Sequence, residues 1–237
     1  NRKKKYFKKK KIIFVVNSNW MRKMAQKSLI LRDQKIHTFF ASFDLKNYYF
    51  DANEKFKEKL NINTKKKLLL YGAQNIEASY KGFKYFLESL DYIDKNKYFL
   101  IFFGNFWNEN VIKKKKFEFK NLGFINDLNF QRKLYSISDL FVATSIQEGF
   151  PKTVAESLLC ETPVVYFKDT AIEDVCEHNL IGGYGADYCN SRDLAKGIDW
   201  IADSQNNPKI LAKKGAEKIR KNFNSDLLIE KYIKLYE

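Results

Sequence analysis

Short apolar runs alternate along this chain with longer stretches whose apolar residues recur at helical spacing, and this alternation restricts the fold more than any other feature. The apolar runs are rich in β-branched and aromatic residues; they lie at 12–16, 67–71, 98–103, 139–143 and 163–167. The clearest helical stretch is 81–93, and others lie at 151–160, 171–178, 191–202, 208–222 and 225–236. Strands and helices in alternation predict an α/β fold with a doubly wound parallel sheet, covered by helices on both faces.

Composition supports a globular domain that needs no crosslinks. The 237 residues are 45% hydrophobic and 16% aromatic, which excludes disordered, collagen-like and coiled-coil chains. The three cysteines are odd in number and lack CxxC spacing, so neither a disulfide framework nor a zinc site is expected. His37 and His178 stand alone without ligand spacing, so no metal is expected. These features predict a reducing, cytoplasmic setting.

The charge is strongly positive and unevenly placed. The formal net charge is +15, and residues 2–5 and 8–11 contribute eight positive charges. The apolar run that follows is too short for a signal peptide, and no stretch is long enough to span a membrane. An anionic membrane surface, which would make the protein peripheral at the inner face of the membrane, is one partner for this Lys/Arg tail and for the lysines at 113–116; solvated lysines are the alternative. Nucleic acid is less favoured, because the rest of the chain has no nucleic-acid-binding motif.

A site is predicted in the stretch that follows the run at 139–143. In a doubly wound sheet, ligands bind beyond the carboxyl ends of the strands, where helix N-termini point. Here Gly149 permits close backbone approach, and Pro151 suits the first turn of a helix. The backbone amides of Lys152 and Thr153 are then expected to be free donors for a phosphate or a sugar hydroxyl.

Two carboxylates frame that helix start. Glu148 lies in the loop, and Glu156 follows after seven intervening residues, inside the helix. A carboxylate accepts hydroxyl hydrogen bonds but repels phosphate, so Glu156 suits a ribose diol and Glu148 a sugar. The alternative is that both are ordinary surface carboxylates.

A second candidate pair is Gly72, after the run at 67–71, and Lys81 at the start of the next helix. A glycine at a strand end admits a ligand near the backbone, and a lysine adds a point charge suited to pyrophosphate. A turn glycine and a solvated lysine are the alternative. Neither GxGxxG nor GxxxxGK[ST] occurs, which removes the main support for dinucleotide-dehydrogenase and P-loop functions.

The order of these pieces resembles the carboxy-terminal half of a retaining GT-B glycosyltransferase of glycosyltransferase family 4. The Glu, seven residues, Glu motif of that family is matched by EGFPKTVAE at 148–156. SISDLFVATS and ETPVVYF resemble the strands on either side, KGFKYFLESL an earlier helix, and LGFIND the segment that lines the base. VVNSNWMRKMAQKS and FFASFDLKNYYF resemble the last unit of the amino-terminal domain and the crossing between domains.

The resemblance implies a division of the chain and roles for its residues. Residues 1–50 would be the basic tail, an amino-terminal remnant of one strand-helix-strand unit and the crossing; 51–222 would be a Rossmann-like domain that binds a nucleotide sugar; 223–237 would be a helix that returns to the amino-terminal domain. Glu156 would hold the ribose, Glu148 a donor-sugar hydroxyl near the reacting carbon, and Lys81, beside Gly72, the pyrophosphate. The backbone around Gly149, Phe150, Lys152 and Thr153 would face the sugar and phosphates, and that of Phe124 and Ile125 the base.

The implied activity is transfer of a sugar, of the hexosyl type, from a nucleoside diphosphate sugar to an acceptor hydroxyl with retention and without a metal. The acceptor would be a saccharide or lipid-linked saccharide in bacterial polysaccharide or glycolipid assembly. Three departures from the family pattern stand out: Ala73 and Gln74 replace a usual arginine, KDTA at 168–171 lacks a glycine pair, and most of the amino-terminal domain is absent, so low activity of this chain alone is expected. The alternative function is a basic, non-catalytic module that binds an anionic membrane or nucleic acid.

Overall fold

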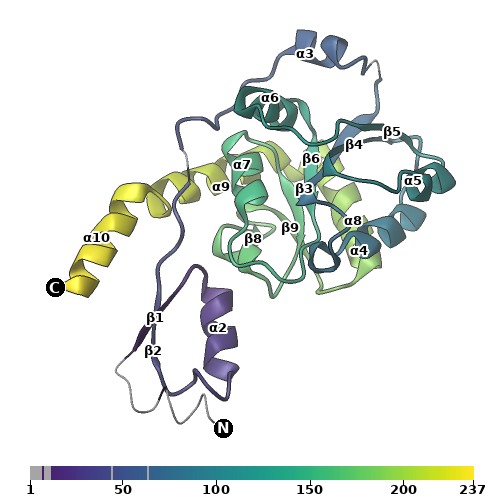
Figure 1. Cartoon of the computed structure of the whole chain (residues 1–237). Coiled ribbons are helices and arrows are strands. Elements are labelled where there is room, and N and C mark those ends of the chain that lie inside the picture. Colours follow the sequence, from purple (N-terminus) through teal and green to yellow (C-terminus); the bar gives the residue numbers. More distant parts are fainter. Residues whose placement is uncertain (1–6, 8–11, 44, 63) are drawn as a thin grey trace.

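A seven-stranded parallel sheet forms the body of the protein (Figure 1). The computed structural model describes residue 7 and residues 12–43, 45–62 and 64–237. The strand order is β5-β4-β3-β6-β7-β9-β8, and each pair of neighbouring strands is parallel. The strands are β3 (Lys67–Asn75), β4 (Tyr98–Asn105), β5 (Glu118–Asn121), β6 (Leu140–Ala143), β7 (Val164–Phe167), β8 (Glu177–His178) and β9 (Gly182–Ala186). The predicted doubly wound α/β fold is therefore confirmed.

Helices cover both faces of the sheet because successive strand residues point to opposite sides. In β3, Leu68 and Leu70 join one buried cluster, and Leu69 and Tyr71 join the other. The first cluster lies beneath α3 (Glu54–Lys59), α6 (Leu128–Ile137), α7 (Lys152–Leu159) and α9 (Pro208–Asn222). The second lies beneath α4 (Phe83–Ser89), α5 (Asn110–Lys115) and α8 (Ser191–Ala202).

The prediction of a helix at 171–178 is wrong. Only a 3-10 turn, η3 (Ala171–Asp174), forms there, with the side chain of Thr170 accepting a hydrogen bond from the amide of Ile172. Residues Glu177 and His178 then join the sheet as β8, beside β9. The stretch at 81–93 begins its helix only at Phe83, because Gly82 takes a left-handed conformation, and its end forms the 3-10 turn η2 (Leu90–Tyr92) after α4.

The first part of the described chain is a separate unit of β1 (Ile13–Val16), α2 (Asn19–Lys27) and β2 (Lys35–Thr38). Its two strands pair in parallel and do not join the large sheet. The unit meets η3 through Asn19, whose backbone N and Nδ2 donate to the two carboxylate oxygens of Asp174 at 2.9 and 2.8 Å. The basic tail that the sequence singles out lies, apart from Phe7, outside the described residues.

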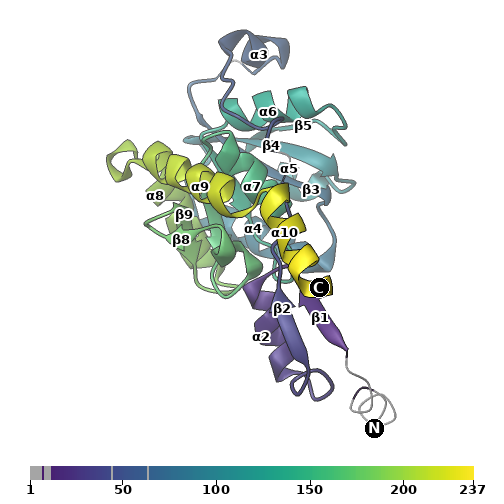
Figure 2. The same ribbon diagram turned by 90° about the vertical axis from the view of Figure 1, so that its left-hand side faces the viewer.

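The last helix, α10 (Ser225–Tyr236), extends from the end of α9 towards the β1–β2 pair (Figure 2). The ring of Tyr232 meets that of Phe39 edge-on, with 4.9 Å between centroids. Much of the helix remains open, and Ile229, Ile233 and Tyr236 are exposed. The described residues between β2 and α3, 39–43 and 45–53, which we call the crossing segment, lead from the small unit to α6 and to the loop before α7.

Candidate functional site

Two loops meet at the carboxyl ends of β3 and β6. After β3, the 3-10 turn η1 (Ser79–Lys81) brings Lys81 back towards β6. The hydroxyls of Tyr71 and Thr144 both donate to the carbonyl oxygen of Lys81, at 3.2 and 2.9 Å. The amide of Ile146 donates to the carbonyl of Tyr80 at 2.9 Å. These bonds hold the loop after β3 against the loop that leads into α7.

Gly82 is required for this close approach. Its φ is +65°, in the left-handed region that glycine adopts without strain. A Cβ at this position would lie 2.1 Å from the carbonyl oxygen of Thr144. The two loops can therefore be in contact only with glycine at this position.

The contact between the loops brings Lys81 and Glu148 together. Lys81 Nζ donates to Glu148 Oε1 at 3.0 Å, and each side chain is 15% exposed. The two residues are 67 positions apart in the sequence, so the fold, and not local spacing, pairs them. A partly buried ammonium and carboxylate at the carboxyl ends of parallel strands form a site for polar, charged ligands.

Glu156 lies inside α7 and faces α6. The hydroxyl of Tyr135 donates to Glu156 Oε2 at 3.2 Å. Burial raises the pKa of Glu156 above its ordinary value; the hydrogen bond from Tyr135, the charge of Lys152 and the polar hydroxyl of Tyr48 oppose that rise. The carboxylate therefore lies in a partly desolvated environment of low dielectric constant, where its hydrogen bonds to hydroxyls are stronger than in water.

The start of α7 corrects one expectation. Pro151 precedes the helix at the cap position, and the amide of Lys152 donates to the carbonyl of Phe150 at 3.0 Å, so this amide is not a free donor. The amide of Thr153 has no acceptor among the described residues. The side chain of Phe150 stacks on Phe43 of the crossing segment, with 4.5 Å between ring centroids. That stacking fixes the backbone of the loop just after Gly149.

The prediction that Gly72 follows the end of a strand is wrong. Gly72 lies within β3, not after it, and is paired with Phe103 of β4. A Cβ at Gly72 would lie 2.0 Å from the Phe103 ring. The missing side chain thus makes room for a core aromatic residue, and the strand continues to Asn75.

Phe124 and Ile125 lie between β5 and α6, with Phe124 exposed and Ile125 packed on the core. The carbonyl of Ile125 accepts a hydrogen bond from Gln131 Nε2 at 3.3 Å. Gln131, Tyr135 and Tyr48 are not among the site residues predicted from the sequence. Tyr135 falls on the buried face of a helix, which gives no signal that distinguishes it from a core residue.

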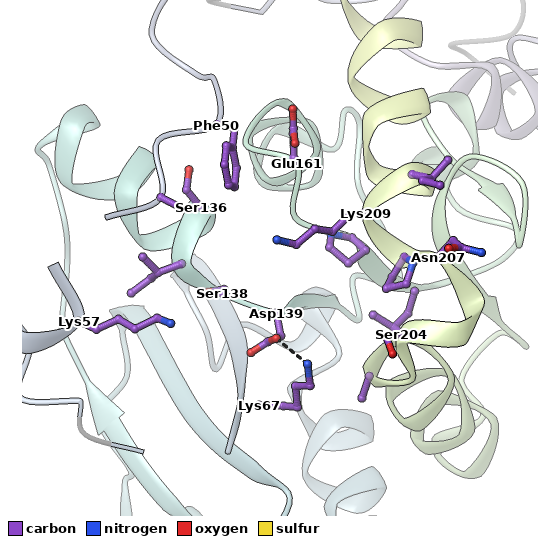
Figure 3. A pocket seen from close by; sticks show the side chains of 17 residues that line it. Phe50, Lys57, Lys67, Ser136, Ser138, Asp139, Glu161, Ser204, Asn207 and Lys209 are labelled. Carbon is purple, nitrogen blue, oxygen red and sulfur yellow. Dashed lines mark hydrogen bonds and ion pairs between the residues drawn. The ribbon is translucent and has the colours of Figure 1, made fainter. Parts of the chain in front are cut away.

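The cavity in Figure 3, about 400 Å³ in volume, lies elsewhere. Lys67 at the start of β3 and Asp139 just before β6 line it and form an ion pair at 3.0 Å. Lys209 of α9 points into the same space. The amino ends of the strands therefore form this cavity, at the edge of the sheet opposite to the Lys81–Glu148 pair.

Among the described residues, no group of three or more His, Cys, Asp or Glu side chains is arranged to hold a metal ion. Within the same part of the chain, none of the helices has the length and apolar character required to cross a membrane.

Solved structures assign this architecture to the GT-B glycosyltransferase fold. A glycosyltransferase from Rickettsia africae aligns with all of this chain and 66% of its own, with a TM-score of 0.83 and 20% identity. Anabaena HepE in complex with UDP and glucose aligns with 94% of this chain and 62% of its own, with a TM-score of 0.73 and 19% identity. At these identities the likeness shows the fold alone.

The chain belongs to the family Glycosyl transferases group 1, which matches residues 52–218. It is also 27% identical over 191 residues to N,N'-diacetylbacillosaminyl-diphospho-undecaprenol alpha-1,3-N-acetylgalactosaminyltransferase of Campylobacter jejuni. The match covers 79% of this chain and 48% of that relative. The chain thus spans about half the length of this curated relative.

Proposed function

We propose that this chain is the donor-binding part of a retaining glycosyltransferase of glycosyltransferase family 4. It takes a hexosyl group from a nucleoside diphosphate sugar and gives it to an acceptor hydroxyl. The observation that carries the proposal is the 3.0 Å Lys81–Glu148 pair, at the same edge of the sheet as the start of the helix that bears Glu156. HepE, which shares the fold, binds UDP and glucose, and this supports a nucleotide-sugar donor.

Each site residue has a proposed role. Glu156 accepts hydrogen bonds from the ribose hydroxyls, and the backbone at Phe124 and Ile125 faces the base. Lys81 binds the diphosphate, because an ammonium is a compact point charge that suits phosphate oxygens. Glu148 accepts a hydroxyl of the donor sugar near the reacting carbon.

The backbone at the start of α7 completes the proposed donor site. The amide of Thr153 is aimed at the phosphates, while Gly149 and Phe150 line the sugar. Lys152, whose amide bonds to Phe150, adds its side-chain charge near Glu156. Gly72 acts only by letting β3 and β4 pack closely beneath the site.

The proposed chemistry is electrostatic. The bond from the anomeric carbon to the diphosphate oxygen breaks, and Lys81 and the helix amide stabilise the charge that develops on the departing diphosphate. With retention, the acceptor oxygen attacks the face that the diphosphate leaves, so a diphosphate oxygen is the nearest base for the hydroxyl proton. These proposed steps use no metal.

The proposed acceptor is a saccharide or a lipid-linked saccharide in bacterial polysaccharide or glycolipid assembly. The name of the Campylobacter jejuni relative specifies a diphospho-undecaprenol-linked acceptor, which supports this class. A peripheral position at the inner face of a membrane, in contact with anionic lipid through lysines, belongs to the same proposal. Family membership favours the enzyme over a basic binding module.

A thermal-shift panel with UDP, GDP, ADP and CMP tests donor binding. One nucleoside diphosphate at about 100 times its Kd should stabilise the fold by about 2.7 kcal/mol, which raises Tm by roughly 5–10 °C. Glu156→Gln should abolish that rise. Glu161→Gln is the matched control, because Glu161 lies beyond the other end of α7 and pairs with Lys213. A full shift retained in Glu156→Gln would refute the site.

A further inference from the structure

The crossing segment is fastened to α6 by one arginine. Arg132 Nε and Nη2 both donate to Asp51 Oδ2, at 3.3 and 3.0 Å, and Nη1 donates to the carbonyl of Asn47 at 3.4 Å. The guanidinium also lies 4.2 Å from the centroid of the Tyr49 ring. The segment around Tyr48 is therefore held against α6 from both sides.

Tyr48 is buried and reaches one end of the proposed nucleoside site. It is 5% exposed, and its hydroxyl donates to Gln131 Oε1 at 2.8 Å. Gln131 Nε2 donates in turn to the carbonyl of Ile125 at 3.3 Å. Because an amide donates only from its nitrogen, the bond to Ile125 fixes which way Gln131 faces. Tyr48 thereby holds the backbone of the segment assigned to the base.

Tyr48 also reaches the other end of that site. Its ring lies 6.4 Å from that of Tyr135, the residue that donates to Glu156. The hydroxyl of Tyr48 is also one of the polar groups that lower the pKa of Glu156 and so favour its ionised form. One side chain from the crossing segment therefore bonds to the glutamine that holds Ile125 and packs against the tyrosine that donates to Glu156.

We propose that Tyr48 and Gln131 are positioning residues that tie Glu156 and the backbone of Ile125 into one polar network. The inference rests on the proposed function, in which Glu156 meets the ribose and Ile125 the base. The network makes the crossing segment part of the nucleoside site, although the family match begins at residue 52. Fixing both contacts before the ligand arrives lowers the ordering cost of binding.

The pH dependence of nucleotide binding reports the charge state of Glu156. A purely structural role of Tyr48 would leave that pH dependence unchanged. The titratable groups that face this carboxylate are Tyr48 of the crossing segment, Tyr135 of α6, Lys152 of α7, and Cys160 just after α7. Removing the Tyr48 hydroxyl removes a polar group that lowers the pKa of the carboxylate. The pKa of Glu156 should then rise further, so the carboxylate should become protonated at a higher pH than in the parent chain. As the pH is lowered, the variant should therefore lose nucleotide affinity earlier than the parent does.

The experiment is calorimetric titration of the whole chain with UDP between pH 5 and 8. Tyr48→Phe should weaken UDP about fivefold at pH 7, the effect of one hydrogen bond, and shift the acid loss of affinity to higher pH. Gln131→Met should weaken UDP similarly. The double variant should be little weaker than either single variant, because the two side chains act through one contact.

Tyr49→Phe is the matched control. It makes the same chemical change one residue away, at a half-exposed ring that packs on Arg132. Its UDP affinity and pH profile should match those of the parent chain, and both variants should unfold cooperatively. If Tyr48→Phe behaves like Tyr49→Phe while Glu156→Gln loses UDP, the positioning role is overturned and the proposed function stands. If the folded parent chain binds none of UDP, GDP, ADP or CMP, both are overturned.

Discussion

An ionised Glu156 is expected to favour nucleotide binding and to lower the stability of the fold. Burial raises its pKa, which means that the folded protein holds the carboxyl proton more tightly than the unfolded chain does. This contribution to stability is fully present below the unfolded pKa and is lost as the pH rises through the folded pKa. An ionised Glu156 at neutral pH therefore lowers the free energy of unfolding.

Replacing Glu156 by glutamine should consequently stabilise the fold while it removes nucleotide affinity. Urea unfolding should give Glu156→Gln a higher free energy of unfolding than the parent at pH 8. The difference should shrink as the pH falls through the pKa of Glu156. Equal or lower stability of Glu156→Gln at pH 8 would contradict a desolvated carboxylate at this position.

Lys81 should act on the phosphate end of the ligand alone. Lys81→Met removes a charge-assisted hydrogen bond, which is worth about 1.5–3 kcal/mol, so UDP should bind roughly 10- to 100-fold more weakly. Uridine affinity should stay nearly unchanged. Lys84→Met is the control, since Lys84 is an exposed residue of α4 with its ammonium 4.6 Å from the centroid of the Tyr85 ring. Calorimetry with UDP and uridine separates these outcomes, and equal losses for both ligands would count against the assigned role.

Sequence reasoning identified the charged residues of the site better than its glycine and aromatic residues. Lys81 and Glu148 were both predicted, and the structure pairs them. Gly72 was expected just after a strand, whereas it lies within β3, where its missing side chain accommodates Phe103 of a neighbouring strand. A contact between residues 31 positions apart depends on the register of β3 and β4, which spacing along one strand does not reveal.

At the level of secondary-structure elements, the site depends on the contact between the loops that follow β3 and β6. Gly82→Ala should force the loops apart, because its Cβ would meet the carbonyl of Thr144. Gly123→Ala is a matched control, since Gly123 has the same φ of +65° but no atom within 4 Å of the added Cβ. Both variants carry the left-handed strain, of order 1–3 kcal/mol. Urea unfolding should show the larger loss for Gly82→Ala; equal losses would contradict the contact.

Elements with strong periodicity were predicted well, and those defined by tertiary pairing were not. The apolar runs at 67–71 and 98–103 became β3 and β4, and the stretch at 208–222 became α9. The short strand β8 carries two exposed residues, so it has no apolar pattern to reveal it. Its existence depends on pairing with the glycine-rich β9, whose Gly183 has no space for a side chain against Val164.

On the scale of the whole molecule, the β1–α2–β2 unit was predicted as a strand-helix-strand piece outside the main sheet, and the structure keeps its strands in a separate pair. Its position could not be predicted, because the Asn19–Asp174 contact joins residues 155 positions apart. The same holds for the crossing segment, whose aromatic residues showed no period. Their partners, Arg132 and Phe150, are set by the folded arrangement of α6 and α7.

The Asn19–Asp174 contact should control how firmly that unit holds to the main body. Asp174→Ala removes both acceptors of Asn19, so amides at the start of α2 should exchange with solvent faster. Asp33→Ala, at an exposed position on the same unit, should leave exchange there unchanged. Hydrogen exchange resolved by peptide measures both. Unaltered exchange of α2 in Asp174→Ala would mean that other contacts hold the unit.

The most direct test of the central claim is hydrogen exchange of the whole chain with and without saturating UDP. The account predicts slower exchange at residues 79–83 and 145–156, which carry Lys81, Glu148 and Glu156, and no change at 202–210 beside the cavity in Figure 3. Protection at 202–210, with none at 79–83 or 145–156, would place the nucleotide at the opposite edge of the sheet and contradict the account.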